Sequence, residues 1–99
     1  MNFYLTRKAK ADLKSIARYT QKQWGVHQRN IYLSQVDRAF HDLSEMPGKG
    51  RKCDHIRAGY WKYKVGKHFI FYRSINKKEI EIVRILHERM DIPNRLDED

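Results

Sequence analysis

The feature that most constrains the fold is a pair of apolar runs in the C-terminal half of the chain. Residues 69–73 and 79–87 are rich in aromatic and β-branched side chains, and a short polar turn at residues 76–78 separates them. Such runs are typical of strands that pair in a hairpin. We therefore expect the stretch from Phe69 to Asp91 to form the centre of a sheet.

The first half of the chain has the periodicity of helices. A short strand is expected over residues 2–6, and Thr6 is a suitable N-cap for a helix. Apolar residues then recur every three or four positions over residues 8–24, which predicts an amphipathic helix that ends at Gly25. A second helix is predicted over residues 27–46. The two helices, with little between them, should form an antiparallel hairpin.

The second half is predicted to be a meander of three strands, over residues 58–63, 68–74 and 79–87. A basic loop precedes it at residues 48–56. This loop contains two glycines, but it lacks the preceding strand and the Gly-Lys-Ser/Thr sequence of a phosphate-binding loop. The predicted fold is therefore α+β: an antiparallel meander sheet of the N-terminal strand and three C-terminal strands, with the helical hairpin packed on it.

Length and composition limit the remaining possibilities. The 99 residues are enough for one domain, so we expect a single domain over residues 1–99, with a flexible tail at residues 94–99. No apolar run approaches the roughly 20 residues of a membrane span. The single cysteine, Cys53, allows no intramolecular disulfide, which favours a cytoplasmic location. Basic neighbours would lower the pKa of Cys53, but an inert loop or core thiol is the preferred interpretation.

Positive charge is concentrated in one part of the chain. The net charge is +9, and residues 47–78 contain ten Lys or Arg but only one acidic residue, Asp54. The segment after Met90 is acidic. The basic segment should attract a polyanion, which is either nucleic acid or an acidic protein segment.

The sequence contains no obvious set of metal ligands or nucleophiles. Its five histidines are scattered, and it has no serine nucleophile motif, so neither a metal site nor a cofactor is expected. The remaining candidates are cations interleaved with aromatic residues in the predicted sheet. Such a surface is suited to RNA binding, or to a metal-free ribonuclease with a general base and cations that stabilise the phosphorane.

Strand alternation weighs against a catalytic site in the last strand. Arg84 and His87 are three residues apart, so they should point to opposite faces of the sheet. Arg84 should share its face with Ile80, Ile82 and Leu86, and it would meet His87 only if the strand ended or bulged near Leu86. A structural ion pair for Arg84, and a strand-end histidine bonded to backbone for His87, remain open alternatives.

The sequence resembles the ParE toxins of the RelE/ParE superfamily of bacterial toxin–antitoxin modules. The resemblance covers Tyr4 to about Pro93 and includes the order of the predicted elements. The residues that carry it are Trp24-Gly25 between the helices, Arg57 with Gly59 and Tyr60 before the meander, and the closing motif at residues 83–91.

This resemblance implies a toxin that inhibits DNA gyrase, blocks replication and is neutralised in a hetero-oligomer by the acidic C-terminal segment of a ParD-like antitoxin. The expected contacts with the target are Arg84, His87, Arg89, Met90 and Trp24. The expected contacts with the antitoxin are Arg51, Lys52, Arg57, Lys62, Tyr63 and Arg73. The protein would then bind its target without catalysing a reaction.

The RelE branch of the superfamily offers the alternative of a ribosome-dependent mRNA endoribonuclease. In that case the catalytic residues would be Arg57, Arg73, Arg84 and His87. However, Glu88 follows His87 where that branch often has Tyr or Arg. The one carboxylate on the same face, that of Glu81, would be roughly 20 Å from His87 along the strand. We therefore expect no catalytic residues and favour gyrase as the target.

Overall fold

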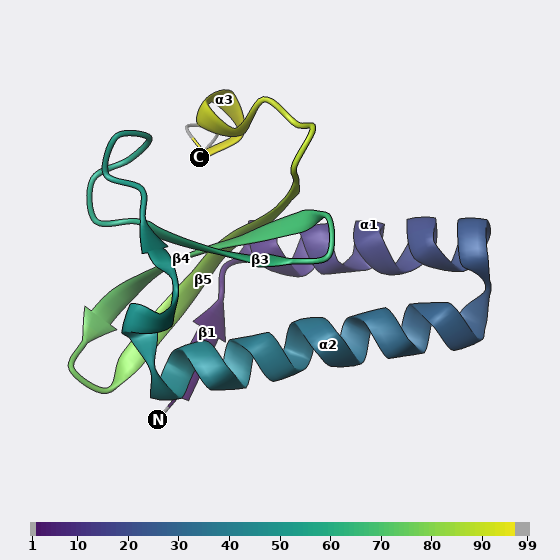
Figure 1. Cartoon of the computed structure of the whole chain (residues 1–99), viewed down its shortest axis with the longest axis horizontal. Helices are drawn as coiled ribbons and strands as arrows, with labels where there is room; N and C mark the ends of the chain where they lie inside the picture. Colours follow the sequence, from purple (N-terminus) through teal and green to yellow (C-terminus); the bar gives the residue numbers. More distant parts are fainter. Residues whose placement is uncertain (1, 97–99) are drawn as a thin grey trace.

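Two long helices lie against one face of a five-stranded sheet, and a short helix lies over the other face (Figure 1). The computed structural model describes residues 2–96. In chain order the elements are β1 (Asn2–Leu5), α1 (Arg7–Trp24), α2 (Val26–Glu45), a 3-10 turn (Pro47–Lys49), β2 (Arg51–Lys52), β3 (Trp61–Val65), β4 (His68–Asn76), β5 (Glu79–His87) and α3 (Ile92–Leu96). The predicted α+β class with a helical hairpin on a sheet is confirmed.

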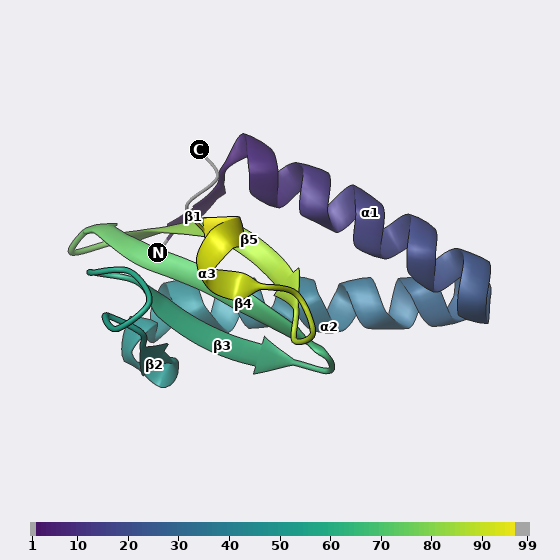
Figure 2. The ribbon, with the colours of Figure 1, turned by 90° about the horizontal axis from the view of Figure 1, so that it is seen from above.

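The sheet is mixed, so the prediction of a purely antiparallel sheet is wrong. The strand order is β1-β5-β4-β3-β2, and β1 runs parallel to β5 while the other pairs are antiparallel. A parallel pair needs only a long crossover between its strands. Here the hairpin and the meander provide that crossover, which places β1 beside β5 (Figure 2).

The elements around the basic loop differ from the predicted boundaries. The third strand runs over Trp61–Val65 rather than 58–63, because Gly59 adopts a φ of 82° and its N–H donates to Asp54 in a turn. The short strand β2 and the helix α3 were not predicted. Residues 94–96 of the predicted flexible tail lie in α3, and Leu96 is buried. The other residues of that tail, 97–99, lie outside the described residues.

Side chains from the two faces of the sheet form two separate apolar clusters. On the face that we call the hairpin face, Ile70, Ile82 and Ile85 pack against residues of both helices, among them Ile16 and Phe40. On the opposite face, which we call the α3 face, the buried residues are Cys53, Tyr60, Phe71, Val83, Leu86 and Leu96. The core therefore extends to both sides of β4 and β5.

A bulge in β5 changes the predicted assignment of side chains to faces. Phe71 lies opposite Arg84 but the next residue, Tyr72, lies opposite Ile82, so Val83 is an extra residue in β5. As a result Ile85 joins Ile82 on the hairpin face, and the predicted sharing of one face by residues 80, 82, 84 and 86 is wrong. Sequence alternation cannot reveal such an insertion, because apolar residues lie on both sides of it.

The hairpin begins and turns as predicted. The Thr6 hydroxyl accepts a hydrogen bond from the Ala9 N–H (3.0 Å) and donates one to the Val83 carbonyl (2.7 Å), so it caps α1 and joins it to β5. Gly25, with a φ of 93°, is the single residue between α1 and α2. Within the described residues, no helix has the length and apolar character needed to cross a membrane.

Candidate binding surfaces

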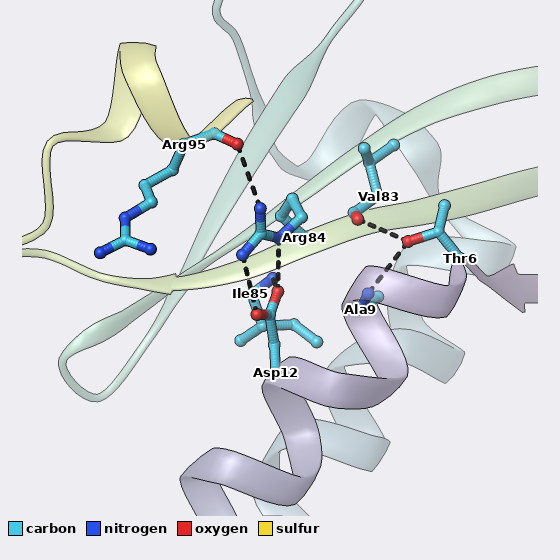
Figure 3. A network of polar contacts seen from close by, with 7 residues as sticks. All are labelled: Thr6, Ala9, Asp12, Val83, Arg84, Ile85 and Arg95. Atoms are coloured by element: carbon cyan, nitrogen blue, oxygen red, sulfur yellow. Dashed lines mark hydrogen bonds and ion pairs between the residues drawn. The ribbon is translucent and has the colours of Figure 1, made fainter. Parts of the chain in front are cut away.

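Arg84 forms a bidentate ion pair with Asp12 of α1 (Figure 3). Its Nε lies 2.8 Å from Oδ2 of Asp12 and its Nη2 lies 3.0 Å from Oδ1. The two side chains are only 11% and 14% exposed. The ion-pair interpretation of Arg84 is therefore confirmed, although its partner lies on α1 rather than inside the sheet.

The same carboxylate completes the edge of β5. Since β1 ends at Leu5, the part of β5 beyond Ile82 has no neighbouring strand on that side. The Ile85 N–H there donates to Oδ2 of Asp12 at 3.0 Å, and the Val83 carbonyl accepts from Thr6. Asp12 thus satisfies a guanidinium and a backbone amide at once, which is what a buried carboxylate requires.

Two arginines bind the C-terminal end of α3. Arg84 Nη1 donates to the Arg95 carbonyl and Arg57 Nη1 donates to the Leu96 carbonyl, each at 3.1 Å. The last carbonyls of a helix have no partner within the helix and carry partial negative charge. Arg57 also lies over the Tyr60 ring, with its guanidinium carbon 5.5 Å from the ring centre. These contacts hold α3 on the sheet.

His87 forms part of a histidine pair at the end of β5. Its ring packs edge-on against the ring of His68, with 5.2 Å between centres. His68 Nδ1 lies 2.6 Å from the Tyr32 hydroxyl of α2, and burial, followed by the nearby His87, lowers the pKa of His68 to about 4. His87 Nδ1 accepts the Arg89 N–H at 3.1 Å, which confirms the interpretation of a strand-end histidine bonded to backbone.

Arg84 and His87 do point to opposite faces of the sheet. From Arg84 to His87 the register is regular: Arg84 lies opposite Phe71 of the α3 face, and His87 lies opposite His68, which contacts α2. The bulge precedes this segment, so it does not bring the two side chains together.

The loop after β5 is exposed. Arg89 and Met90 project from the turn that follows His87, and the Met90 N–H donates to the His87 carbonyl at 3.0 Å. Glu88 forms an ion pair with Lys64 at 2.9 Å, and the hydrogen bond from Lys64 lowers the pKa of Glu88. Glu88 therefore fixes this loop to β3.

The residues predicted to contact an antitoxin are divided among several places. Arg51 lies opposite Lys62, and Lys62 Nζ lies 5.1 Å above the Phe69 ring on the α3 face. Lys52 lies 5.7 Å from the Trp61 ring, and half-buried Tyr63 packs with the hairpin-face cluster. Arg73 follows Tyr72 on β4, the residue opposite Trp61, and its Nε is 2.9 Å from Glu81 of β5.

Two other sequence predictions concern single side chains. Cys53 is buried in the core, as one of the two predicted alternatives has it, and burial raises the pKa of its thiol. Trp24 is 72% exposed at the turn between the helices. Among residues 2–96, no three His, Cys, Asp or Glu side chains come close enough to bind a metal ion.

Sequence reasoning missed Asp12 and Tyr32, which position Arg84 and His68. Asp12 is the only acidic residue of α1, an isolated carboxylate among six cations, which was a usable signal for a buried ion pair. Tyr32 of α2 packs against the hairpin-face cluster, and nothing in the sequence indicates that its hydroxyl reaches His68 and the Val65 carbonyl.

Comparisons with known proteins agree on the family. Residues 3–92 match the family described as "ParE toxin of type II toxin-antitoxin system, parDE". Toxin ParE1 of Mycobacterium tuberculosis is 39% identical over 95% of this chain and 96% of its own. Toxin ParE1 of Caulobacter vibrioides is 37% identical, over 90% and 91%. Toxin ParE of Escherichia coli is 30% identical, over 95% and 91%.

Solved structures show the same fold. A chain of the chromosomal ParDE toxin–antitoxin system of P. aeruginosa superimposes with a TM-score of 0.74 at 22% identity, over 88% of this chain and 95% of that one. A chain of the RelBE2 toxin–antitoxin complex of Mycobacterium tuberculosis does so with a TM-score of 0.65 at 24% identity, over 87% and 88%. This chain belongs to the ParE toxin family of type II toxin–antitoxin systems, within the RelE/ParE superfamily.

Proposed function

We propose that this toxin inhibits DNA gyrase by binding it and catalyses no reaction of its own. The observation that supports this proposal is the use already made of the candidate catalytic side chains. Arg84 binds Asp12, Arg57 binds the end of α3, and Arg73 is paired with Glu81. These contacts stabilise the fold. The three guanidinium groups are therefore poorly placed to bind a phosphate and stabilise its charge during a reaction.

The separation of these groups also favours binding over catalysis. A general base and the cations that stabilise a phosphorane must all lie within hydrogen-bond reach of one phosphate. Arg73 is five residues along β4 from His68, the neighbour of His87, which corresponds to roughly 17 Å of strand. Arg84 and His87 lie on opposite faces. One phosphate cannot contact all of them.

The exposed loop after β5 is the best candidate for a contact with the target. Arg89 and Met90 are exposed, and His87 organises the turn that presents them. Arg84 joins β5 to α1 and α3, and so it holds in place the strand that precedes this loop. We assign Arg89 and Met90 to direct contact, and Arg84 and His87 to positioning.

A ParD-like antitoxin is the proposed partner that neutralises the toxin in a hetero-oligomer. The two similar structures are those of a chromosomal ParDE toxin–antitoxin system and of a RelBE2 toxin–antitoxin complex. The acidic C-terminal segment expected for such an antitoxin is complementary to the cations of β2 and β3, Arg51, Lys52 and Lys62. Tyr63, Arg57 and Arg73 add contacts at its margins. The complex would act in the cytoplasm, without a cofactor.

The test is to express the toxin from a tight promoter and to follow DNA synthesis and mRNA integrity separately. We expect labelled thymidine incorporation to stop first, with mRNA 5′ ends unchanged in the same cells. A positioning role for His87 predicts that His87→Ala weakens this arrest. Fresh cuts inside translated codons, abolished by His87→Ala and Arg73→Ala, would instead identify a ribosome-dependent endoribonuclease.

A further inference from the structure

The turn between α1 and α2 extends well beyond the end of the sheet (Figures 1 and 2). Every residue from 21 to 28 is exposed, and we call these residues the hairpin tip. Large apolar side chains lie in or beside it: Trp24 is 72% exposed, Tyr19 63% and Val26 50%. None of the described residues buries them, although an exposed Trp next to an exposed Val loses the free energy that burial would provide.

The hairpin tip is rigid. A single residue, Gly25, joins the helices, and its N–H donates to the Gln21 carbonyl at 2.9 Å. Arg29 of α2 fastens the two helices together, because its Nη1 donates to Oε1 of Gln21 on α1 at 2.5 Å and its N–H donates to the Gly25 carbonyl. A surface held in this way loses little conformational entropy when a partner binds.

The tip is also free of negative charge. Residues 13–36 contain no Asp or Glu, and they contain four cations, Lys14, Arg18, Lys22 and Arg29. Some cations elsewhere in the described chain have carboxylate partners, as Lys64 has Glu88 and Arg73 has Glu81. The hairpin tip therefore combines exposed aromatic and aliphatic side chains with uncompensated positive charge.

We propose that the hairpin tip is a docking surface for an acidic protein segment that buries Trp24. This inference rests on the proposed function, and it assigns the segment to gyrase. Trp is enriched among the residues that dominate binding energy, and the cations of the adjoining parts of α1 and α2 favour an acidic partner. The end of β5, with Arg89 and Met90 after it, faces the same end of the molecule as the tip, so one partner can contact both (Figures 1 and 2).

Charge argues against a second copy of this chain as the occupant. Two copies paired through this end of the hairpin would bring together the four cations of residues 13–36 in each copy, in a protein whose net charge is already +9. Nucleic acid matches the charge, and an indole stacks on bases, but the aliphatic side chain of Val26 has no role in such a contact. The experiment below includes nucleic acid as a separate outcome.

Three variants of the full chain separate the possibilities. The apolar variant combines Trp24→Ala with Val26→Ser, and the charge variant combines Arg18→Gln with Lys22→Gln. The matched control combines Ile75→Ser with Lys77→Gln and Lys78→Gln, which changes an exposed aliphatic residue and two exposed cations at the opposite end of the sheet. All changed side chains are exposed, so circular dichroism should show unchanged melting within about 2 °C.

Binding to purified gyrase is then measured at low and high salt, with a duplex DNA alone as a second probe. We expect the apolar variant to lose about tenfold or more in affinity, the charge variant to lose most of the salt dependence, and the control to bind as the wild type does. If the wild type binds gyrase and the apolar variant binds equally well, the docking surface is refuted while the proposed function stands. If the wild type does not bind gyrase, both fail. If it binds duplex DNA alone and the apolar variant does not, the tip is a nucleic-acid surface and the inference is wrong.

A direct readout is available because the chain has two tryptophans, Trp24 and Trp61. In protein labelled with 5-fluorotryptophan, the Trp24 fluorine resonance is assigned by its absence from Trp24→Phe. Adding gyrase should shift or broaden that resonance more than the resonance of half-buried Trp61. A change confined to Trp61 would place gyrase on the sheet and refute the inference.

Discussion

The residue-scale question is how Arg84, which is nearly buried, keeps its charge. The Asp12 carboxylate provides the counter-charge: it accepts two hydrogen bonds from the guanidinium and one from the Ile85 N–H. The sequence places the cation on the last strand but cannot place its partner, because 72 residues separate the two in the chain. The bulge at Val83 could not be predicted from the sequence either. Both are tertiary features, which no local pattern encodes.

Removing the carboxylate tests this role of Asp12. Asp12→Ala leaves Arg84 buried without a counter-charge, and the free energy of unfolding should fall by about 3 to 5 kcal/mol. Urea denaturation measures it. The control is Asp37→Ala, an exposed helical acid whose carboxylate lies 3.5 Å from the His41 ring, and it should cost less than about 1 kcal/mol. Equal losses in the two variants would contradict a structural role for Asp12.

His68 should make stability depend on pH. Its folded-state pKa, about 4, lies below the ordinary 6.5, so the unfolded chain binds a proton more readily than the folded protein between these values. Protonation then favours unfolding, and stability falls as pH drops from about 6.5 to about 4, by no more than about 3 kcal/mol from this group. Urea titrations at pH 7 and pH 4.5 measure the loss. It should shrink in His68→Gln and persist in His41→Gln, whose ring is exposed; an unchanged loss in His68→Gln would exclude this explanation.

At the scale of elements, length and periodicity decide what the sequence can predict. The helices α1 and α2 and the strands β4 and β5 are long enough for their apolar period to show. The strand β2 has two residues and α3 has five, and both exist because tertiary contacts hold them: β2 pairs with β3, and Arg57 and Arg84 bind the end of α3. The direction of β1 likewise depends on its partner.

The contact between α2 and the β3–β4 turn can be tested at one glycine. Gly66 has a φ of 57°, and a Cβ there would lie 2.8 Å from a ring carbon of Tyr32. We expect Gly66→Ala to reduce the free energy of unfolding by roughly 1 to 3 kcal/mol, from backbone strain and displacement of Tyr32. Gly48→Ala is the control, since a Cβ there meets no atom within 4 Å. Similar unfolding midpoints for both variants would show that Tyr32 does not need this close approach.

At the scale of the whole molecule, positive charge is distributed unevenly and lies in two separate regions. Cations gather on β2, β3 and the adjoining loops, and a second acid-free region covers the hairpin tip at the other end. Composition predicted an anionic partner. It could not show that the basic residues lie in separate places, because that depends on which face each strand presents.

Salt-dependent antitoxin binding is the prediction at this scale. Arg51→Gln with Lys52→Gln should weaken binding of the acidic segment of a ParD-like antitoxin severalfold at low salt, and the difference should diminish at high salt. Isothermal titration calorimetry with a synthetic acidic segment measures it. Arg57 is left unchanged because it binds the Leu96 carbonyl. The control is Lys77→Gln with Lys78→Gln. Unchanged affinity at low salt would count against electrostatic recognition at β2.

The most direct test of the central claim is a supercoiling assay with purified toxin, purified gyrase and relaxed plasmid. A toxin that acts by binding gyrase should block supercoiling, with cleaved plasmid accumulating as the ratio of toxin to gyrase rises. The plasmid should remain intact when the toxin is added without gyrase. Normal supercoiling and no cleaved plasmid at high ratios of toxin to gyrase would contradict the account.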